Sequence, residues 1–262
     1  MISSIEIRDL EDKNEYFVGT CSHLNESEEI DHCSEIRLKW LKNRIEKGAD
    51  VKVAHVAGVP RGFIYSLPIE ISPWGPIGKD CYCIPCLYVT NDHTKQGIGR
   101  KLIEAVAESA IQKGATGIVT MGYYHDMWFM PANYFIKNGF TPLVRRGEEV
   151  LLGRSFSEQF KIPKLLTPNY KYVGQQGKVV VDLFWNAFCQ TCVIEALRVK
   201  RICKEMGKDV VLNEYRADIG YVLDKYQIPR GVFINGKEYY WGYEAPAVEI
   251  RGIIMNELNK IK

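Results

Sequence analysis

Two cysteines separated by two residues, Cys189 and Cys192, form the clearest pair of reactive side chains in the sequence. They follow the apolar run VVVDLFW, and apolar residues then repeat at helical spacing over residues 192–206. The start of a helix stabilises a thiolate, so we expect a lowered pKa for Cys189 and assign it as the attacking thiol, with Cys192 as the resolving thiol. Half of a zinc site or a purely structural pair are the alternatives, but no second CxxC and no His pair occurs in this half of the chain.

Two glycines, Gly97 and Gly99, open a predicted helix at residues 97–113 directly after a strand and a polar loop. The first amides of a helix lack carbonyl partners and carry a partial positive charge, and glycine lets a ligand approach the backbone closely. Arg100 and Lys101 add positive charge at the same place. The turn therefore predicts binding of a phosphate or pyrophosphate, with a tight turn without ligand as the alternative. The third glycine of a Rossmann fingerprint and the Lys-Ser or Lys-Thr of a P-loop are both missing.

The composition predicts a soluble globular chain of two modest domains. The chain has 262 residues, of which 46% are hydrophobic and 25% charged, which excludes disordered, collagen-like and coiled-coil classes. The 34 basic and 32 acidic residues give a net charge of +2, so a strongly basic nucleic-acid surface is excluded. The sequence lacks an apolar run of about 18 residues and an N-terminal secretion signal, so we expect a cytoplasmic protein without membrane partners. In that compartment the eight cysteines are free, metal-bound or redox-active thiols.

Hydrophobic periodicity and turn residues predict a mixed α/β chain. Strands are predicted at residues 5–10, 51–70 (two strands), 80–90 and 117–121, helices within 13–49 and at 97–113 and 131–138, and a hairpin at 140–156 that turns near Gly147. Prolines and glycines interrupt any period at residues 158–177, which are the predicted linker between domains 1–157 and 178–262. The second domain has the predicted order βαβαββα.

Residues 3–157 resemble the Gcn5-related N-acetyltransferase (GNAT) family. The family motif has Gly, any residue, and Gly or Ala at the start of its long helix, which Gly97, Ile98 and Gly99 match. Its second cofactor segment ends in Gly-Phe, as does YFIKNGF at residues 134–140. The resemblance implies a mixed central sheet with flanking helices, acetyl-CoA as cofactor and direct acetyl transfer to a small amine.

The resemblance also implies which residues bind the cofactor. The backbone at Leu87 and Val89 is expected to hold the pantetheine arm, where the family's sheet splays apart next to a strand represented here by residues 119–121. Pro85 suits a bulge at that point because it has no amide to donate. The pyrophosphate is expected on the amides of Gln96, Gly97, Ile98, Gly99, Arg100 and Lys101.

Two positions depart from the family pattern. Thr94 replaces the first basic or amide residue of the motif, for which Arg100 and Lys101 can compensate. Phe135 stands where the family often has a Tyr that protonates the leaving thiolate, and Tyr134 is its neighbour. Adjacent helical residues point about 100° apart, so Tyr134 is an uncertain replacement for that catalytic group.

Acetyl transfer needs a neutral amine, so a base or a water chain must accept a proton. The candidate bases are Glu70, His93, His125, Asp126 and Tyr134, with a surface-polar role as the alternative for each. An aromatic run can line the acceptor pocket or pack within its own loop; it consists of Tyr123, Tyr124, Met127, Trp128 and Phe129.

Three further thiols lie in the segment CYCIPC, at Cys81, Cys83 and Cys86. Strand alternation puts Cys81 and Cys83 on one face. Thiols at this spacing suit a soft metal, but no fourth Cys or His follows at zinc-finger spacing. We therefore favour packing as their role, and we assign no metal site.

Residues 178–262 resemble a thioredoxin-like domain. The CxxC, the order βαβαββα and Ile228-Pro229 carry this resemblance, which implies a cis proline facing the CxxC. The tandem arrangement resembles bacterial proteins of the YoaP-like type. The sequence thus predicts an acetyl-CoA-dependent N-acyltransferase for an amine, with a thiol-bearing small molecule as one candidate acceptor, and a redox CxxC accessory domain. The alternatives are a thiol–disulfide oxidoreductase or thiophilic-metal protein whose first domain only binds CoA, and a CoA- or redox-sensing module.

Overall fold

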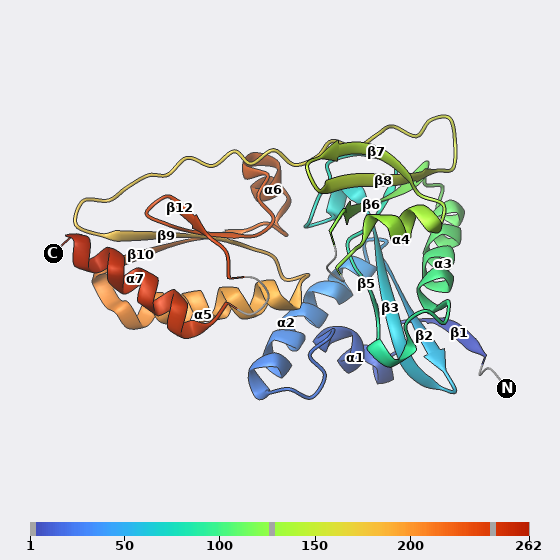
Figure 1. Cartoon of the computed structure of the whole chain (residues 1–262), viewed down its shortest axis with the longest axis horizontal. Coiled ribbons are helices and arrows are strands. Elements are labelled where there is room, and N and C mark those ends of the chain that lie inside the picture. Colours follow the sequence, from blue (N-terminus) through green and yellow to red (C-terminus); the bar gives the residue numbers. More distant parts are fainter. Residues whose placement is uncertain (1–3, 126–128, 242–244, 262) are drawn as a thin grey trace. The chain divides into compact units, whose positions relative to one another are not determined.

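The computed structural model describes residues 4–125, 129–241 and 245–261 (Figure 1). Packing divides the chain into two compact units. The first lies within residues 1–24 and 41–166, and the second within residues 25–40 and 167–262. Each unit has its own sheet and helices, which confirms the predicted mixed α/β fold with a second, smaller sheet.

The sheet of the first unit has the order β1-β2-β3-β4-β6-β8-β7 among the described residues, and β5 pairs with β3 outside this path. β4 and β6 run parallel, and the other neighbouring strands run antiparallel. The strands are β1 (Ile5–Asp9), β2 (Asp50–Val56), β3 (Val59–Pro68), β4 (Tyr82–Ile84), β5 (Leu87–Val89), β6 (Gly117–Tyr123), β7 (Thr141–Arg146) and β8 (Glu149–Ser155). The predicted hairpin is formed by β7 and β8, with Gly147 at a positive φ of 61° in its turn.

Helices cover both faces of this sheet. On one face, α3 buries Leu102, Ile103 and Val106 against a core that includes Ile64 of β3. On the other face, the Phe17 ring of α1 lies 5.6 Å from the ring of Phe63. The helices of this unit are α1 (Glu15–Thr20), α3 (Ile98–Gln112) and α4 (Ala132–Lys137), with short 3-10 turns η1 (Asp12–Asn14), η2 (Ile69–Ile71) and η3 (Asn91–His93). Helix α2 (Glu28–Ile45) begins in the second unit and ends in the first. Within the described part of the chain, no helix has the length and apolar character to cross a membrane.

The second unit has a four-stranded sheet of order β10-β9-β11-β12. β9 and β10 are parallel, and β11 is antiparallel to both β9 and β12. In Figure 1, α5 and α7 lie along one face of this sheet and α6 lies on the other. The elements are β9 (Val179–Trp185), α5 (Gln190–Met206), η4 (Gly207–Asp209), β10 (Val210–Arg216), α6 (Gly220–Tyr226), β11 (Gly231–Ile234), β12 (Lys237–Tyr239) and α7 (Ala247–Ile261). This order confirms the predicted βαβαββα.

A buried carboxylate organises the α6 side of the second sheet. Asp182 of β9 accepts hydrogen bonds from the hydroxyl of Tyr170 (2.6 Å) and the side-chain amide of Asn213 (2.9 Å). Its neighbour on the same face, Phe184, packs in an aromatic cluster with Phe233 and other rings. Tyr170 precedes β9, so this cluster ties the segment before the sheet to the sheet itself.

The division by packing differs from the predicted linear domain map in two places. Residues 158–166 pack with the first unit, where Ile77 and Lys164 form a β-bridge and the Arg146 guanidinium donates to the carbonyl of Leu166 (2.8 Å). Residues 25–40, which include most of α2, pack with the second unit instead of the first. A domain map predicted along the sequence cannot include contacts between distant residues, such as Arg37 and Phe188, which are 151 positions apart.

Candidate functional sites

The backbone of β5 leaves one edge unpaired. The predicted extended run at 80–90 is broken at Pro85 and Cys86, so that β4 pairs with β6 while β5 pairs with β3. The bonds from Thr90 N–H to Arg61 O and from Tyr65 N–H to Cys86 O direct the even-numbered residues of this segment to β3. In an antiparallel pair the intervening residues point the other way, so the amides and carbonyls of Leu87 and Val89 face an edge that no described strand covers.

The glycine turn lies just beyond this edge. Gly97 is the N-cap of α3 with φ +84°, a left-handed conformation that glycine adopts without strain. The side chains near it are used locally: the Thr94 hydroxyl donates to Asn91 O (3.1 Å), and the Lys101 ammonium donates to Ile5 O of β1 (3.2 Å). The positive character of the turn therefore comes mainly from the first amides of α3, which have no carbonyl partner within the helix.

Tyr134 of α4 reaches the start of α3. A Cβ on Gly99 would lie 2.2 Å from the Tyr134 hydroxyl and 3.5 Å from the Leu87 side chain, so only glycine leaves Tyr134 in place. Burial raises the pKa of Tyr134 to about 12, which keeps the phenol neutral. Phe135 is fully buried in the core instead. Tyr134 is thus the residue of this pair that faces the elements predicted to bind the cofactor.

A small cavity lies where β4 and β5 separate. It has a volume of about 10 Å³, roughly the room for one water molecule. Tyr123 and Phe129 of the predicted aromatic run line it, whereas Tyr124 stacks under the Arg145 guanidinium at 4.5 Å. Met127 and Trp128 lie outside the described residues. The other lining residues are Trp74, Gly75, Cys83, Ile84, Pro85, Met121 and Met130.

A wider, open hollow lies between β1 and α3. Arg100 and Lys101 line it together with Arg8, Asp9 and Glu104, among others. Basic and acidic groups alternate there, and Leu87, Val89, Gln96, Gly97, Ile98 and Gly99 do not line it. Arg100 and Lys101 thus line a hollow that the backbone groups predicted to bind the cofactor do not line, and the Lys101 ammonium contacts β1 there.

In the second unit, Cys189 is the N-cap of α5 and Cys192 lies in its first turn. Cys189 is partly exposed, and its Sγ lies 3.0 Å from the Thr191 hydroxyl. Its pKa lies well below the ordinary value, first because the Cys192 thiol donates a hydrogen bond to it, and further because of Thr191 and the charge of Arg230. Cys192 is buried, and burial together with the neighbouring Cys189 raises its pKa. The two thiols therefore have the unequal acidity that the sequence predicts.

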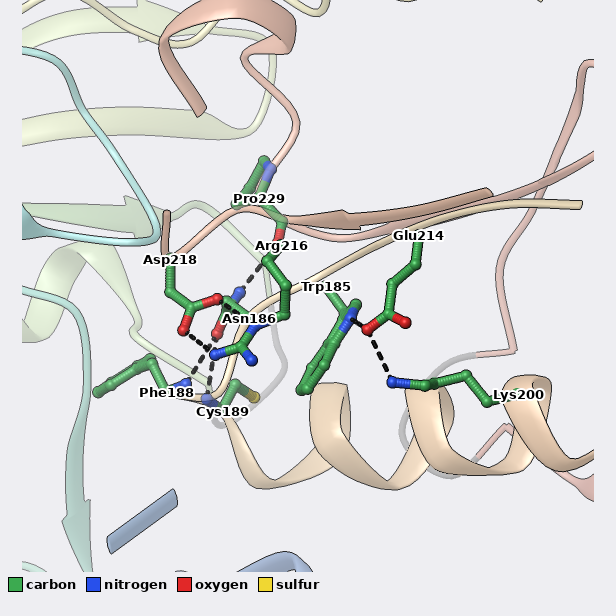
Figure 2. A network of polar contacts seen from close by, with 9 residues as sticks. All are labelled: Trp185, Asn186, Phe188, Cys189, Lys200, Glu214, Arg216, Asp218 and Pro229. Atoms are coloured by element: carbon green, nitrogen blue, oxygen red, sulfur yellow. Dashed lines mark hydrogen bonds and ion pairs between the residues drawn. The ribbon is translucent and has the colours of Figure 1, made fainter. Parts of the chain in front are cut away.

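Asn186 joins the cysteine loop to the loop before β11 (Figure 2). Its side-chain oxygen accepts the amides of Phe188 and Cys189 (both 3.2 Å), and its side-chain nitrogen donates to Pro229 O (2.9 Å). The expected cis proline is wrong: the Ile228–Pro229 bond is trans, and the cis peptide of the described residues is Gly75–Pro76. The trans form is the lower-energy default for a proline, and here the Pro229 carbonyl is already held by Asn186.

Two ion pairs flank the thiols. Arg230 forms a bidentate pair with Glu195 of α5 (2.9 and 3.0 Å), and both side chains are largely buried. Arg216 pairs with the buried Asp218 and lies over the Trp185 ring at 4.5 Å. The indole nitrogen of Trp185 in turn donates to Glu214 (2.8 Å), which also pairs with Lys200, as Figure 2 shows.

Comparison with known proteins bears on the site formed by β5, the glycine turn of α3 and Tyr134. Residues 11–140 match the model of the acetyltransferase (GNAT) family. These residues form a GNAT acetyltransferase domain. The match includes the open edge of β5, the glycine turn and Tyr134. Among curated proteins, no match was found.

Several solved structures are similar to part of the chain. PaiA N-acetyltransferase from Thermoplasma acidophilum, solved with coenzyme A, is 18% identical, with 58% of this chain and 99% of that chain covered and a TM-score of 0.42. YncA from Salmonella typhimurium, solved with acetyl-CoA, is 18% identical; the match covers 59% of this chain and 95% of that chain, with a TM-score of 0.44. Ribosomal-protein-alanine N-acetyltransferase from Brucella melitensis is 15% identical; the match covers 58% of this chain and 99% of that chain, with a TM-score of 0.44.

The candidate bases of the GNAT domain differ in their surroundings. Glu70 accepts the amide of Asp80 (2.8 Å), and the ring of His93 contacts Asp92 (2.9 Å). The ring of His125 stacks on Tyr123 with centroids 5.3 Å apart, and its Nδ1 is buried without a hydrogen-bond partner among the described residues. Asp126 lies outside the described residues. His125 is thus the candidate beside a residue that lines the small cavity.

The CYCIPC thiols behave as apolar residues in the GNAT domain. Cys81 and Cys83 share one buried cluster with Ile69, Val119 and Leu151, which confirms that they lie on one face and pack there. Burial raises the pKa of each to about 12. Nowhere in the described ranges do three or more His, Cys, Asp and Glu side chains gather as a metal site.

Sequence reasoning missed Asn186, Glu195 and Arg230 as parts of the thiol site. Asn186 had a usable signal, since an Asn just before a helix start commonly bonds to backbone amides. Glu195 lies one helical turn after Cys192 on the same face, which also could have been noticed. Arg230 approaches only through the fold of β11 beside β9, and no local pattern indicates it.

We expect iodoacetamide to modify Cys189 before the buried thiols. Between pH 8 and pH 6 its rate should fall less steeply than that of an ordinary thiol, which slows about tenfold per pH unit, because the pKa of Cys189 is depressed. Cys81 and Cys83 in the same protein serve as internal comparators and should stay unmodified. Mass spectrometry of the alkylated fragments measures all sites together. A tenfold loss of rate at Cys189 for each pH unit would contradict the assignment.

Proposed function

We propose that the protein is an acetyl-CoA-dependent N-acetyltransferase that acts on a small amine. The GNAT family match of residues 11–140 supports the reaction class. The observation that best supports acetyl-CoA as the cofactor is the uncovered edge at Leu87 and Val89, which lies next to the glycine turn of α3.

These residues fit acetyl-CoA chemically. A pantetheine arm carries amide groups that can pair with the free backbone groups of β5, much as another strand would. The first amides of α3 suit a pyrophosphate, and a Cβ at Gly97 would meet no atom within 4 Å, so the approach to the turn is open. When bound, acetyl-CoA supplies a thioester whose acetyl group an amine can attack.

The protein's own groups then stabilise charge and move protons. Backbone amides near the β5 edge can polarise a carbonyl oxygen placed there. The neutral Tyr134 phenol, close to both Gly99 and Leu87, can donate its proton to a departing thiolate. We therefore assign Tyr134, and not Phe135, the role of proton donor.

Replacing Tyr134 with Phe should lower kcat by about 100-fold, because general acid catalysis commonly contributes at least this factor. The dissociation constant of acetyl-CoA should change little. The measurement is formation of acetylated product from a panel of small amines, amino acids and peptide α-amines, followed by mass spectrometry. Tyr88→Phe is the matched control, since Tyr88 lies on the other face of β5 against Phe63. An undiminished kcat in Tyr134→Phe would exclude this tyrosine as the proton donor.

A second function, thiol–disulfide exchange, is favoured by the position of Cys189 at the start of α5 and its lowered pKa. We propose that the second unit is thioredoxin-like, which the order βαβαββα and the sheet order support and the trans Pro229 does not. The Cys189 thiolate would attack a substrate disulfide and release one substrate thiolate. The Cys192 thiolate would then attack the Cys189 sulfur, releasing the second thiol and leaving a Cys189–Cys192 disulfide, so two electrons pass to the substrate.

A redox titration tests this second function. The protein is equilibrated with mixtures of reduced and oxidised dithiothreitol at the reducing end and of reduced and oxidised glutathione at the oxidising end, and free thiols are trapped and mapped. We expect one two-electron transition that converts Cys189 and Cys192 together, and none at this site in Cys192→Ser. Thiols that stay reduced in every mixture would leave the second unit without redox activity.

A further inference from the structure

The peptide bond that joins Phe188 to Cys189 is held from both sides. Its N–H, at Cys189, donates to the Asn186 side chain (3.2 Å). Its carbonyl, at Phe188, accepts a hydrogen bond from Nε of Arg37 (2.6 Å). The backbone immediately before the partly exposed thiol is therefore fixed by two buried side chains, of which one comes from α2.

The α2 segment 25–40 belongs by packing to the second unit, although it lies within the GNAT family match. The Arg37 guanidinium lies 5.7 Å from the centre of the Phe188 ring, and the Trp40 ring packs edge-on against the same ring. The Gln190 side chain, on the other side of Cys189, donates to Ile30 O (2.9 Å). Residues of α2 thus contact both sequence neighbours of the reactive cysteine.

A separate contact joins α2 to α5 through two side chains that are not part of this loop. Arg198 of α5 forms a bidentate pair with Glu29 of α2, with distances of 3.0 and 2.6 Å. Arg198 lies more than two helical turns along α5 from Cys189. A substitution of Arg198 therefore tests the effect of holding α2 in place, separately from the effect of holding the Phe188 carbonyl.

We propose that Arg37 is a positioning residue for the Cys189 thiol, which it keeps over the first turn of α5 by holding the Phe188 carbonyl. The inference rests on the proposed thiol function. Cys189 is an extended N-cap (ψ 126°), and its sulfur contacts the Thr191 hydroxyl in the first turn of α5. These contacts depend on the backbone angles at Cys189, which the held peptide group restricts. Loss of the Arg37 bond frees the loop, and the sulfur then spends less time over the helix amides that stabilise its negative charge.

The other charged groups around the thiols come from other elements. Arg230, before β11, is paired with Glu195 of α5, and Arg216 of β10 is paired with Asp218. Neither pair includes a residue of α2. A substitution of Arg37 therefore leaves these charges in place, and a changed pH profile of Cys189 then reports the loop and the Arg37 charge together.

The experiment measures the rate of iodoacetamide alkylation at Cys189 against pH in the reduced full-length protein, with fragment mass spectrometry. For Arg37→Met we expect the midpoint of the profile to move up by about one pH unit, which is about tenfold slower reaction at pH values below both midpoints. Arg37→Lys retains the charge but not the planar Nε donor, and we expect it to move the profile in the same direction. Arg198→Gln is the matched control, and its profile should overlay that of the wild type.

The outcomes separate the inference from the function on which it rests. A wild-type profile typical of an ordinary thiol would overturn the thiol function and this inference with it. A depressed wild-type profile that neither Arg37 variant moves would overturn the inference alone. An equal shift in Arg198→Gln would assign the effect to the packing of α2 as a whole. If Arg37→Met fails to fold, as judged by circular dichroism, Arg37→Lys decides between these outcomes.

Discussion

The unpaired amides at the start of two helices are the feature on which both candidate sites depend. Each of α3 and α5 follows a strand through a short loop and begins with backbone N–H groups that have no carbonyl partner in the helix. Such a helix start attracts negative charge. In the proposed functions, the start of α3 binds a ligand at Gly97, whereas at α5 the chain supplies its own anion, the Cys189 thiolate.

The residue at the N-cap decides between these two uses. Gly97 takes a positive φ and presents no side chain, so its turn stays open to a phosphate. Cys189 has an extended backbone, and its sulfur contacts the Thr191 hydroxyl in the first turn of α5. The neighbouring contacts differ accordingly. Tyr134 approaches Gly99 because that residue has no Cβ, while Asn186 and Arg37 fix the peptide group before Cys189.

Much of this arrangement could be predicted from the sequence, because its signals are local. The glycines of the α3 turn, the CxxC before an amphipathic helix, and the break at Pro85 each lie within a few residues of the structure they determine. The order βαβαββα followed from periodicity alone. Features that depend on contacts between distant residues could not be predicted. The cis bond expected at Pro229 was wrong, and the position of Arg230 beside the thiols and the packing of residues 25–40 with the second unit were missed. The choice between Tyr134 and Phe135 also needed the structure, since adjacent positions on α4 differ only in the direction they face.

Calorimetric titration of acetyl-CoA into the fully reduced protein tests the central claim most directly. Our account predicts saturable binding with a dissociation constant in the micromolar range, which is a binding free energy of about −8 kcal/mol. It predicts much weaker binding to Gly97→Val, because a valine side chain disfavours the positive φ at this position. Binding that is absent in the wild type, or equal in the two proteins, would contradict the assignment of the α3 turn and the β5 edge as the acetyl-CoA site.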